Sequence, residues 1–187
     1  MEHQMEILFI HGAGGWEDDQ PMAEALYELL GVPVSAPRFP DEDMSAAAWR
    51  SEIERQRAAL GPELVIVGHS FGASMALQHF SGSRPGNGPG SGPGDPPLGL
   101  ALLAMPFWGA EGWQAEYALP PEAELPAGLP VWLHHCRDDD VVPFGHLGRH
   151  AARLPHARVR GHATGGHQFR DRMTAVADDL TALRPQP

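Results

Sequence analysis

The chain has 187 residues, of which 42% are hydrophobic and 20% are charged. This length suits one domain, and the composition is that of a globular protein with a buried core. The 13 lysine and arginine residues against 24 aspartate and glutamate residues give a formal net charge of −11. Nucleic acids and anionic membrane surfaces bind clustered cations, so the charge speaks against both as partners.

The cysteine content and the first residues bear on the expected compartment. Cys136 is the single cysteine of the sequence, so it allows no intrachain disulfide and no thiolate metal cluster. The polar residues 1–6 lead into a short apolar run, 7–10. That run is too short for the apolar segment of a secretion signal or for a membrane span. We therefore expect a cytoplasmic protein.

Strand and helix signals alternate along the chain. Short apolar runs bounded by glycine, proline or polar residues predict strands; they are 5–11, 32–36, 63–67, 98–105, 131–135 and a weaker 156–160. Apolar residues at helical spacing, with capping residues and glycine stops, predict helices; they are about 18–30, 45–60, 71–80, 144–154 and 170–183. This alternation predicts an α/β fold with about six mostly parallel strands and helices on both faces.

Residues 81–97 are composed mainly of glycine, proline and serine. Such a segment has almost nothing apolar to bury and predicts a flexible surface insert. The sequence on either side supplies only part of the expected sheet. We therefore expect one domain over 1–187 rather than two domains joined by a linker.

A G-x-S-x-G pattern lies between an expected strand and an expected helix, as Gly68-His69-Ser70-Phe71-Gly72. In this context a strained turn exposes the serine hydroxyl above the sheet, and the two glycines let strand and helix pack closely. The helix N-terminus adds free N–H groups beside the serine, where an oxyanion would develop. The pattern predicts Ser70 as a nucleophile; the alternative is a glycine-bounded turn with an incidental serine.

A serine nucleophile needs a base to take its proton. His167 follows two glycines between the last expected strand and the last expected helix. This loop reaches the carboxyl edge of the sheet, where Ser70 is expected, and so His167 is the predicted base. His162, directly after the strand, is the competing candidate.

The base in turn needs an acid that orients it, and in this fold the acid lies between the serine and the histidine in the chain. Asp138, Asp139 and Asp140 stand in a row after the fifth expected strand. The sequence favours Asp139, which lies four residues before Pro143 and the next helix, and leaves Asp138 as the second choice.

Histidines beside this acidic triplet raise the alternative of a metal site. His134 and His135 are adjacent on an expected strand, so their side chains face opposite sides. No second pair of ligands occurs at a spacing typical of metal sites. We expect no metal.

Taken together, the serine elbow 68–72, the acid loop 137–143 and the Gly166-His167 loop resemble the α/β-hydrolase superfamily in kind and in order. The resemblance covers the chain apart from the insert. It implies an active site at the carboxyl end of the sheet and no cofactor. His11-Gly12-Ala13-Gly14-Gly15-Trp16 resembles the H-G-x-x-G loop of that superfamily, and this implies the N–H groups of Ala13 and Phe71 as oxyanion donors.

A finer likeness rests on Phe39-Pro40-Asp41 followed by Trp49. These residues resemble the small, lid-poor serine hydrolases of the retinoblastoma-binding-protein-nine type, and so a minimal lid is expected. The insert and Cys136, which stands where many relatives have a small residue, depart from that group.

The segment 106–128 lies where larger relatives insert a lid, and it is rich in aromatic residues. Phe107 and Trp108, with His11 and Trp16 near the oxyanion loop, are candidates for the wall of a short acyl pocket. They could equally pack over the core as ordinary loop residues.

The expected function is therefore a serine hydrolase that cleaves the carboxylester or thioester bond of a small substrate through an acyl-enzyme. Amidase, perhydrolase and C–C hydrolase activities would use the same groups. A catalytically silent scaffold that serves as a binding module is the alternative. The sequence leaves the oligomeric state open.

Overall fold

Six parallel strands form one sheet in the computed structural model, which describes residues 4–82, 96–110 and 112–183. Most of the expected insert, 83–95, lies outside these residues. The strands are β1 (Glu6–Ile10), β2 (Val34–Ser35), β3 (Leu64–His69), β4 (Gly99–Leu103), β5 (Val131–Cys136) and β6 (Arg158–His162). Their order across the sheet is β2-β1-β3-β4-β5-β6. The expected parallel α/β sheet is confirmed.

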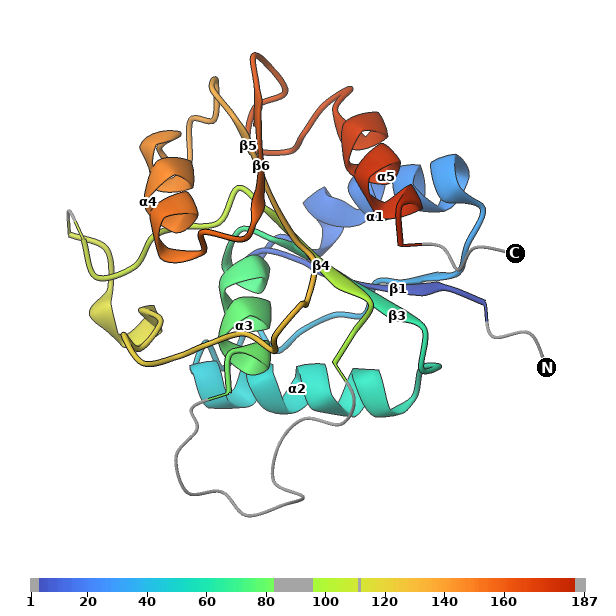
Figure 1. The fold of residues 1–187 in the computed structure, drawn as a ribbon, viewed down its shortest axis with the longest axis horizontal. Coiled ribbons are helices and arrows are strands. Elements are labelled where there is room, and N and C mark those ends of the chain that lie inside the picture. Colours follow the sequence, from blue (N-terminus) through green and yellow to red (C-terminus); the bar gives the residue numbers. More distant parts are fainter. Residues whose placement is uncertain (1–3, 83–95, 111, 184–187) are drawn as a thin grey trace.

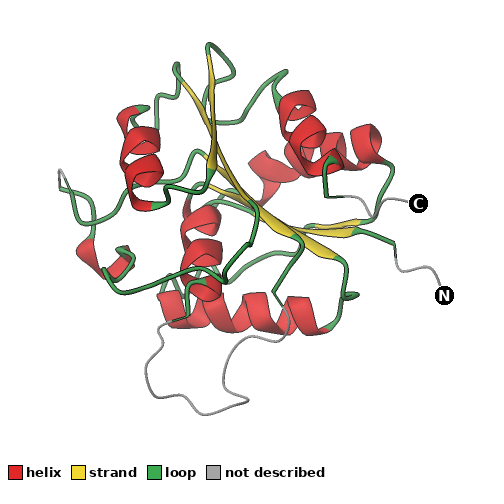
Figure 2. Ribbon diagram, in the orientation of Figure 1, coloured by secondary structure: helices red, strands yellow, loops and turns green. Residues whose placement is uncertain are grey.

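Helices cover both faces of the sheet, as expected (Figure 1). One face carries α1 (Trp16–Leu30) and α5 (Met173–Thr181). The other face carries α2 (Ala46–Ala58), α3 (Phe71–Phe80) and α4 (Gly145–Arg153). Between β4 and β5, the described residues form loop apart from the short 3₁₀ helix η1 (Ala115–Tyr117), as Figure 2 shows.

Alternate residues of each central strand fill two separate cores. In β1, Ile7 and Phe9 pack toward α1 and α5, whereas Leu8 and Ile10 pack toward α2 and α3. All four are at most 1% exposed. A strand buried on both faces reads as a continuous apolar run, which is why β1, β3 and β4 were visible in the sequence.

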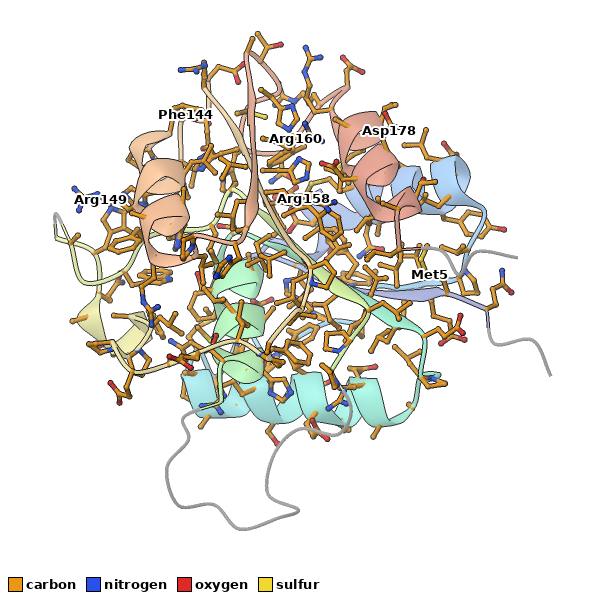
Figure 3. The ribbon with its side chains drawn as sticks, in the orientation of Figure 1. Met5, Phe144, Arg149, Arg158, Arg160 and Asp178 are labelled. Carbon is orange, nitrogen blue, oxygen red and sulfur yellow. The ribbon has the colours of Figure 1, made fainter. Side chains whose placement is uncertain are left out.

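The edge strand β6 gave a weaker signal because it is solvent-exposed and cationic. Arg158 and Arg160 of this strand, labelled in Figure 3, are solvent-exposed. The Arg158 guanidinium lies 5.2 Å from the ring of Trp132, and Arg160 forms two hydrogen bonds with Asp179 of α5. Charged side chains on an edge strand discourage pairing with another sheet.

The last helix begins at Met173, later than the expected 170. The preceding residues form turns in which Phe169 and Asp171 adopt positive φ angles of 52° and 58°. Both are non-glycine residues in the left-handed region, so the helical pattern could not extend through them. The loop that carries His167 is consequently longer than the sequence indicated.

No helix in the described ranges has the length and apolar character needed to cross a membrane.

Candidate active site

Ser70 occupies a sharp turn between β3 and α3. Its φ and ψ angles are 52° and −121°, and its N–H donates to the carbonyl of Leu103 on the adjacent strand over 2.8 Å. A non-glycine residue in this region is sterically costly and persists where the surrounding structure fixes it. The turn leaves Ser70 half-buried at the carboxyl end of the sheet, in the conformation expected for a nucleophile elbow.

The two glycines of the elbow are required by space. A Cβ at residue 68 would lie 2.6 Å from Cα of Ala73, and one at residue 72 would clash with the carbonyls of Ile10 and His11. Real Cβ atoms do not approach backbone atoms so closely. The strand, the helix and the end of β1 therefore meet at a distance that only glycine permits.

His167 and Asp139 form a hydrogen-bonded pair beside the elbow. Nδ1 of His167 lies 2.9 Å from Oδ2 of Asp139, and the Asp139 side chain is fully buried. Its other oxygen, Oδ1, accepts the N–H groups of Val141 and Val142 at 2.8 and 2.9 Å. Burial favours the neutral acid, but these hydrogen bonds and that of His135 outweigh it and hold the pKa of Asp139 well below its usual range.

The supporting contact from His135 was not anticipated from the sequence. Nε2 of His135 lies 3.1 Å from Oδ2 of Asp139 and 3.0 Å from the carbonyl of Val142. Both partners are acceptors, so Nε2 carries a hydrogen. His135 is 1% exposed and on the last strand before the acid, so it supports the carboxylate from within the core.

The other two aspartates of the triplet lie elsewhere. Asp138 accepts the N–H groups of Gly165 and Gly166 at 3.2 and 2.8 Å and so holds the loop that precedes His167. Asp140 is exposed. The structure brings Asp139, and neither neighbour, to His167.

The competing histidine, His162, faces away from the acid. Its Nε2 lies 3.1 Å from Nδ1 of His134, and the two rings are stacked. Burial lowers the pKa of His162. Its ring also packs edge-on against Phe169.

The loops of Ser70 and His167 are adjacent at the carboxyl end of the sheet. The ring of His69, which directly precedes Ser70, lies 4.6 Å from the ring of His167. Among the described residues, no hydrogen bond joins Oγ of Ser70 to His167, and none engages Nε2 of His167, whose side chain is 12% exposed. Such bonds are often absent without substrate and tighten in the reacting complex.

The loop after β1 is held so that the N–H of Ala13 is available. The carbonyl of Gly12 accepts hydrogen bonds from Nδ1 of His11 and from the N–H of Gly15, at 2.6 and 3.0 Å. In a trans peptide the next N–H points away from that carbonyl. Within the described ranges, no hydrogen bond uses the N–H of Ala13 or that of Phe71.

His11 lies beneath this loop, with both ring nitrogens engaged by backbone. Its Nε2 accepts the N–H of Phe39 at 2.8 Å, so the hydrogen is on Nδ1, which donates to Gly12. The ring is 1% exposed and packs edge-on against Phe39 and Trp49. The structure thus places His11 beneath the loop that carries Ala13, and His11 does not line the cavity that Phe107 and Trp108 reach.

A second buried carboxylate, Asp19, was missed by sequence reasoning. Its Oδ2 accepts the N–H of Gly12 at 2.8 Å and lies 2.7 Å from Nδ1 of His69. In the sequence, Asp19 was visible only as a helix-start residue and His69 only as a variable position of the elbow motif. They are fifty residues apart, and the pairing of β1 with β3 brings them together.

Aromatic side chains lie on the α3 side of the elbow. The ring of Trp108 packs edge-on against Phe71 and Tyr117, and its Nε1 donates to Oγ of Ser74 at 2.7 Å. Next to it is a cavity of about 70 Å³. Its lining includes Ser74, Leu77, Met105, Phe107, Trp108 and Tyr117. Ser74 is one helical turn beyond Ser70, so this cavity begins close to the elbow.

Phe107 and Trp16, the other two residues predicted to line an acyl pocket, lie in different places. Phe107 reaches the cavity, and its ring packs against His150. Trp16 lies at the start of α1, where its Nε1 donates to the carbonyl of Ala36 and Arg38 lies 5.7 Å from its ring. The structure therefore separates Trp16 from the cavity that Phe107 and Trp108 line.

In the part of the chain that the structure describes, no group of three or more histidine, cysteine, aspartate or glutamate residues is arranged to hold a metal ion. Cys136 is buried against the loop that carries His167, where a Cβ at Gly165 would lie 2.8 Å from the Sγ of Cys136. Burial and the nearby carboxylates raise the pKa of the Cys136 thiol to about 12, so it stays protonated and unreactive at neutral pH.

Comparisons with known proteins agree with this architecture. A family model described as "Alpha/beta hydrolase family" matches residues 7–121. A search of curated protein sequences gives no match.

Several solved structures have a similar fold. The ydeN gene product from B. subtilis is 16% identical, with a TM-score of 0.70 over 96% of this chain and 98% of that one. Alpha/beta hydrolase domain-containing protein 10 from mouse is 16% identical, with a TM-score of 0.69 over 97% and 90%. Zea mays acyl-protein thioesterase 2 is 20% identical, with a TM-score of 0.65 over 97% and 94%.

Proposed function

The chain belongs to the alpha/beta hydrolase family, and on this basis we propose that it is a serine hydrolase that cleaves an ester-type bond of a small substrate. The observation that carries the proposal is the hydrogen bond of 2.9 Å between the buried carboxylate of Asp139 and Nδ1 of His167, beside Ser70 on its strained turn. An acid, a base and an alcohol of these kinds perform acyl transfer on several unrelated folds.

In the proposed first step, Oγ of Ser70 attacks the carbonyl carbon of the substrate while Nε2 of His167 takes the hydroxyl proton. Asp139 holds the hydrogen on Nδ1, so that Nε2 is the basic nitrogen, and stabilises the imidazolium that forms. The substrate oxygen becomes negative and lies between the N–H groups of Ala13 and Phe71. Donors of this kind each contribute about 3–4 kcal/mol to the transition state.

In the second step the leaving alcohol or thiol receives the proton from His167 and departs, which leaves an acyl group on Ser70. A water molecule then gives a proton to Nε2 and attacks the acyl carbonyl. Collapse of the second tetrahedral intermediate returns the proton to Oγ and releases the acid. Every proton moves through one imidazole, and no cofactor takes part.

The proposed substrate has a short, apolar acyl group. The support is the cavity of about 70 Å³ lined largely by apolar and aromatic side chains, one helical turn from the nucleophile. Because one protein of similar fold is a thioesterase, we propose that carboxylesters and thioesters are the bonds to test first. Because the net charge is −11, we propose that the protein binds neither nucleic acid nor membrane. We also propose that it acts in the cytoplasm.

The direct test is a panel of p-nitrophenyl esters and acyl thioesters of two to twelve carbons, assayed with the wild-type protein and with Ser70→Ala. We expect turnover that declines with long chains and that falls on the order of 10⁶-fold in the variant. Ser51→Ala is a matched control that removes an exposed hydroxyl of α2, away from the elbow and the cavity. A wild-type protein as inactive as Ser70→Ala on the whole panel would favour the silent binding module.

A further inference from the structure

The buried pair Asp19 and His69 joins three loops of the site. Asp19 is at the start of α1, and His69 is the last residue of β3. The side chains of both are 1% exposed, and Oδ2 of Asp19 lies 2.7 Å from Nδ1 of His69. A buried carboxylate is costly to maintain unless it accepts hydrogen bonds.

Both ring nitrogens of His69 lie within hydrogen-bond distance of an oxygen atom. Its Nε2 lies 2.9 Å from the backbone carbonyl of His167, an atom that can only accept a hydrogen bond. Its Nδ1 lies 2.7 Å from Oδ2 of Asp19, which also accepts the N–H of Gly12. Burial favours the neutral form of Asp19, but hydrogen bonds from His69 and Gly12 lower its pKa. One imidazole ring therefore bridges a carboxylate and a backbone carbonyl.

The side chain of His69 connects parts of the site that are far apart in sequence. Through Asp19 it is tied to Gly12, next to the proposed oxyanion donor Ala13. Through Nε2 it is tied to the backbone of the proposed base, His167. By its position in the chain it precedes the proposed nucleophile, Ser70.

We propose that Asp19 and His69 are positioning residues, which set the oxyanion loop and the loop of His167 relative to Ser70. This inference rests on the proposed function. The base loop needs such an anchor because Gly165 and Gly166 precede His167 and Phe169 follows with a positive φ angle. A displacement of about 1 Å of a catalytic group costs about 100-fold in rate.

Two substitutions of His69 separate its two hydrogen bonds. His69→Asn places an amide N–H where Nδ1 was, so it can still donate to Asp19 but does not reach His167. His69→Gln places an amide N–H where Nε2 was, so it can still donate to the carbonyl of His167 but leaves Asp19 without its hydrogen-bond donor at residue 69. Both variants lose the imidazole ring.

If His69 has a positioning role, the variant with the lower kcat should be the one with the higher Tm. We expect His69→Asn to lose about 100-fold in kcat with KM within threefold of wild type. His69→Gln should retain at least a tenth of the wild-type kcat, although its Tm falls by roughly 10 °C more because a buried carboxylate is left unpaired. A purely structural role predicts instead that kcat follows Tm. That result, or a wild-type kcat in His69→Asn, would overturn the inference.

A second measurement does not depend on turnover. In ¹⁵N-histidine-labelled protein, the ring ¹⁵N signals report the surroundings of each histidine. The ring signals of His167, assigned with His167→Ala, should move in His69→Asn and stay near their wild-type positions in His69→Gln. If the wild type hydrolyses nothing, the proposed function fails while these spectra still decide the inference. If His69→Gln does not fold, His69→Asn decides it alone, and unchanged His167 signals there contradict it.

Discussion

Oδ2 of Asp139 accepts a hydrogen bond of 2.9 Å from Nδ1 of His167 while the carboxylate is fully buried. Asp139→Asn removes the charge and permits the wrong tautomer of the imidazole, so we expect kcat to fall by about 10⁴. Asp138→Asn is the matched control, since the Asp138 carboxylate accepts hydrogen bonds from Gly165 and Gly166 and, among the described residues, none from His167, and it should lose about tenfold. Steady-state kinetics of both variants test this. A larger loss of kcat in Asp138→Asn than in Asp139→Asn would show that Asp138 is the acid instead.

A methyl group at Gly12 should damage catalysis more than folding. A Cβ at this residue would lie 3.1 Å from Cβ of Ser70 and 3.5 Å from Nδ1 of His69. To relieve these contacts the loop must shift by a few tenths of an ångström, which moves the N–H of Ala13. Because about 1 Å of displacement costs about 100-fold, we expect this smaller shift in Gly12→Ala to lower kcat by about tenfold or less, with a change in Tm of only a few degrees. Unchanged kcat would show that this loop does not approach the reacting atoms.

Gly148, in the exposed middle of α4, provides the contrasting case. A Cβ there meets no atom within 4 Å, and alanine loses less backbone entropy than glycine in a helix. Gly148→Ala should raise the free energy of unfolding by about 0.5–1 kcal/mol and leave kcat unchanged. Urea unfolding measures this effect, and a loss of stability would contradict the open surroundings of Gly148.

The sequence predicts the strands and the fold class well where a strand is a continuous apolar run. The apolar runs of β1, β3 and β4 are buried on both faces, so strands and fold class were evident. β3 continues past the expected end because Gly68 and His69 pair with Leu102 and Leu103 of β4. Such cross-strand pairing has no local signature.

The site was only partly visible for a similar reason. Ser70 and His167 are marked by their glycine-rich surroundings, whereas the choice among three adjacent aspartates depends on the loop conformation after β5. Asp19, His135 and His69 act through contacts with residues distant in the chain or across a turn. Nothing in their local sequence indicates those partners.

Stability should fall in mild acid because of buried neutral histidines. Burial lowers the pKa of His134 to about 3 and that of His150 to about 4, against about 6.5 in the unfolded chain. Between about pH 6.5 and 4 the unfolded state binds protons that the folded state excludes, so unfolding is favoured as the pH falls. Each histidine contributes a slope of about 1.4 kcal/mol per pH unit in this window and almost none above pH 7.5.

Urea unfolding at pH 7.5, 6.0 and 5.0 checks this dependence. Nε2 of His150 lies 3.1 Å from the carbonyls of Met105 and Pro106, and His150→Gln keeps a donor there without titrating. The variant should therefore show a shallower decline than wild type. Equal slopes, or a stability that stays constant down to pH 5.0, would contradict the account.

In the proposed function, Ser70 is an alcohol activated by His167. Labelling with a fluorophosphonate probe at pH 7.5, followed by peptide mass spectrometry, tests it most directly because the probe reacts with activated serines without a need for the natural substrate. We predict one modified serine, Ser70, in the wild type, and no labelling in Ser70→Ala or His167→Ala at the same exposure. Equal labelling of wild type and His167→Ala, or a label on another serine, would contradict the claim.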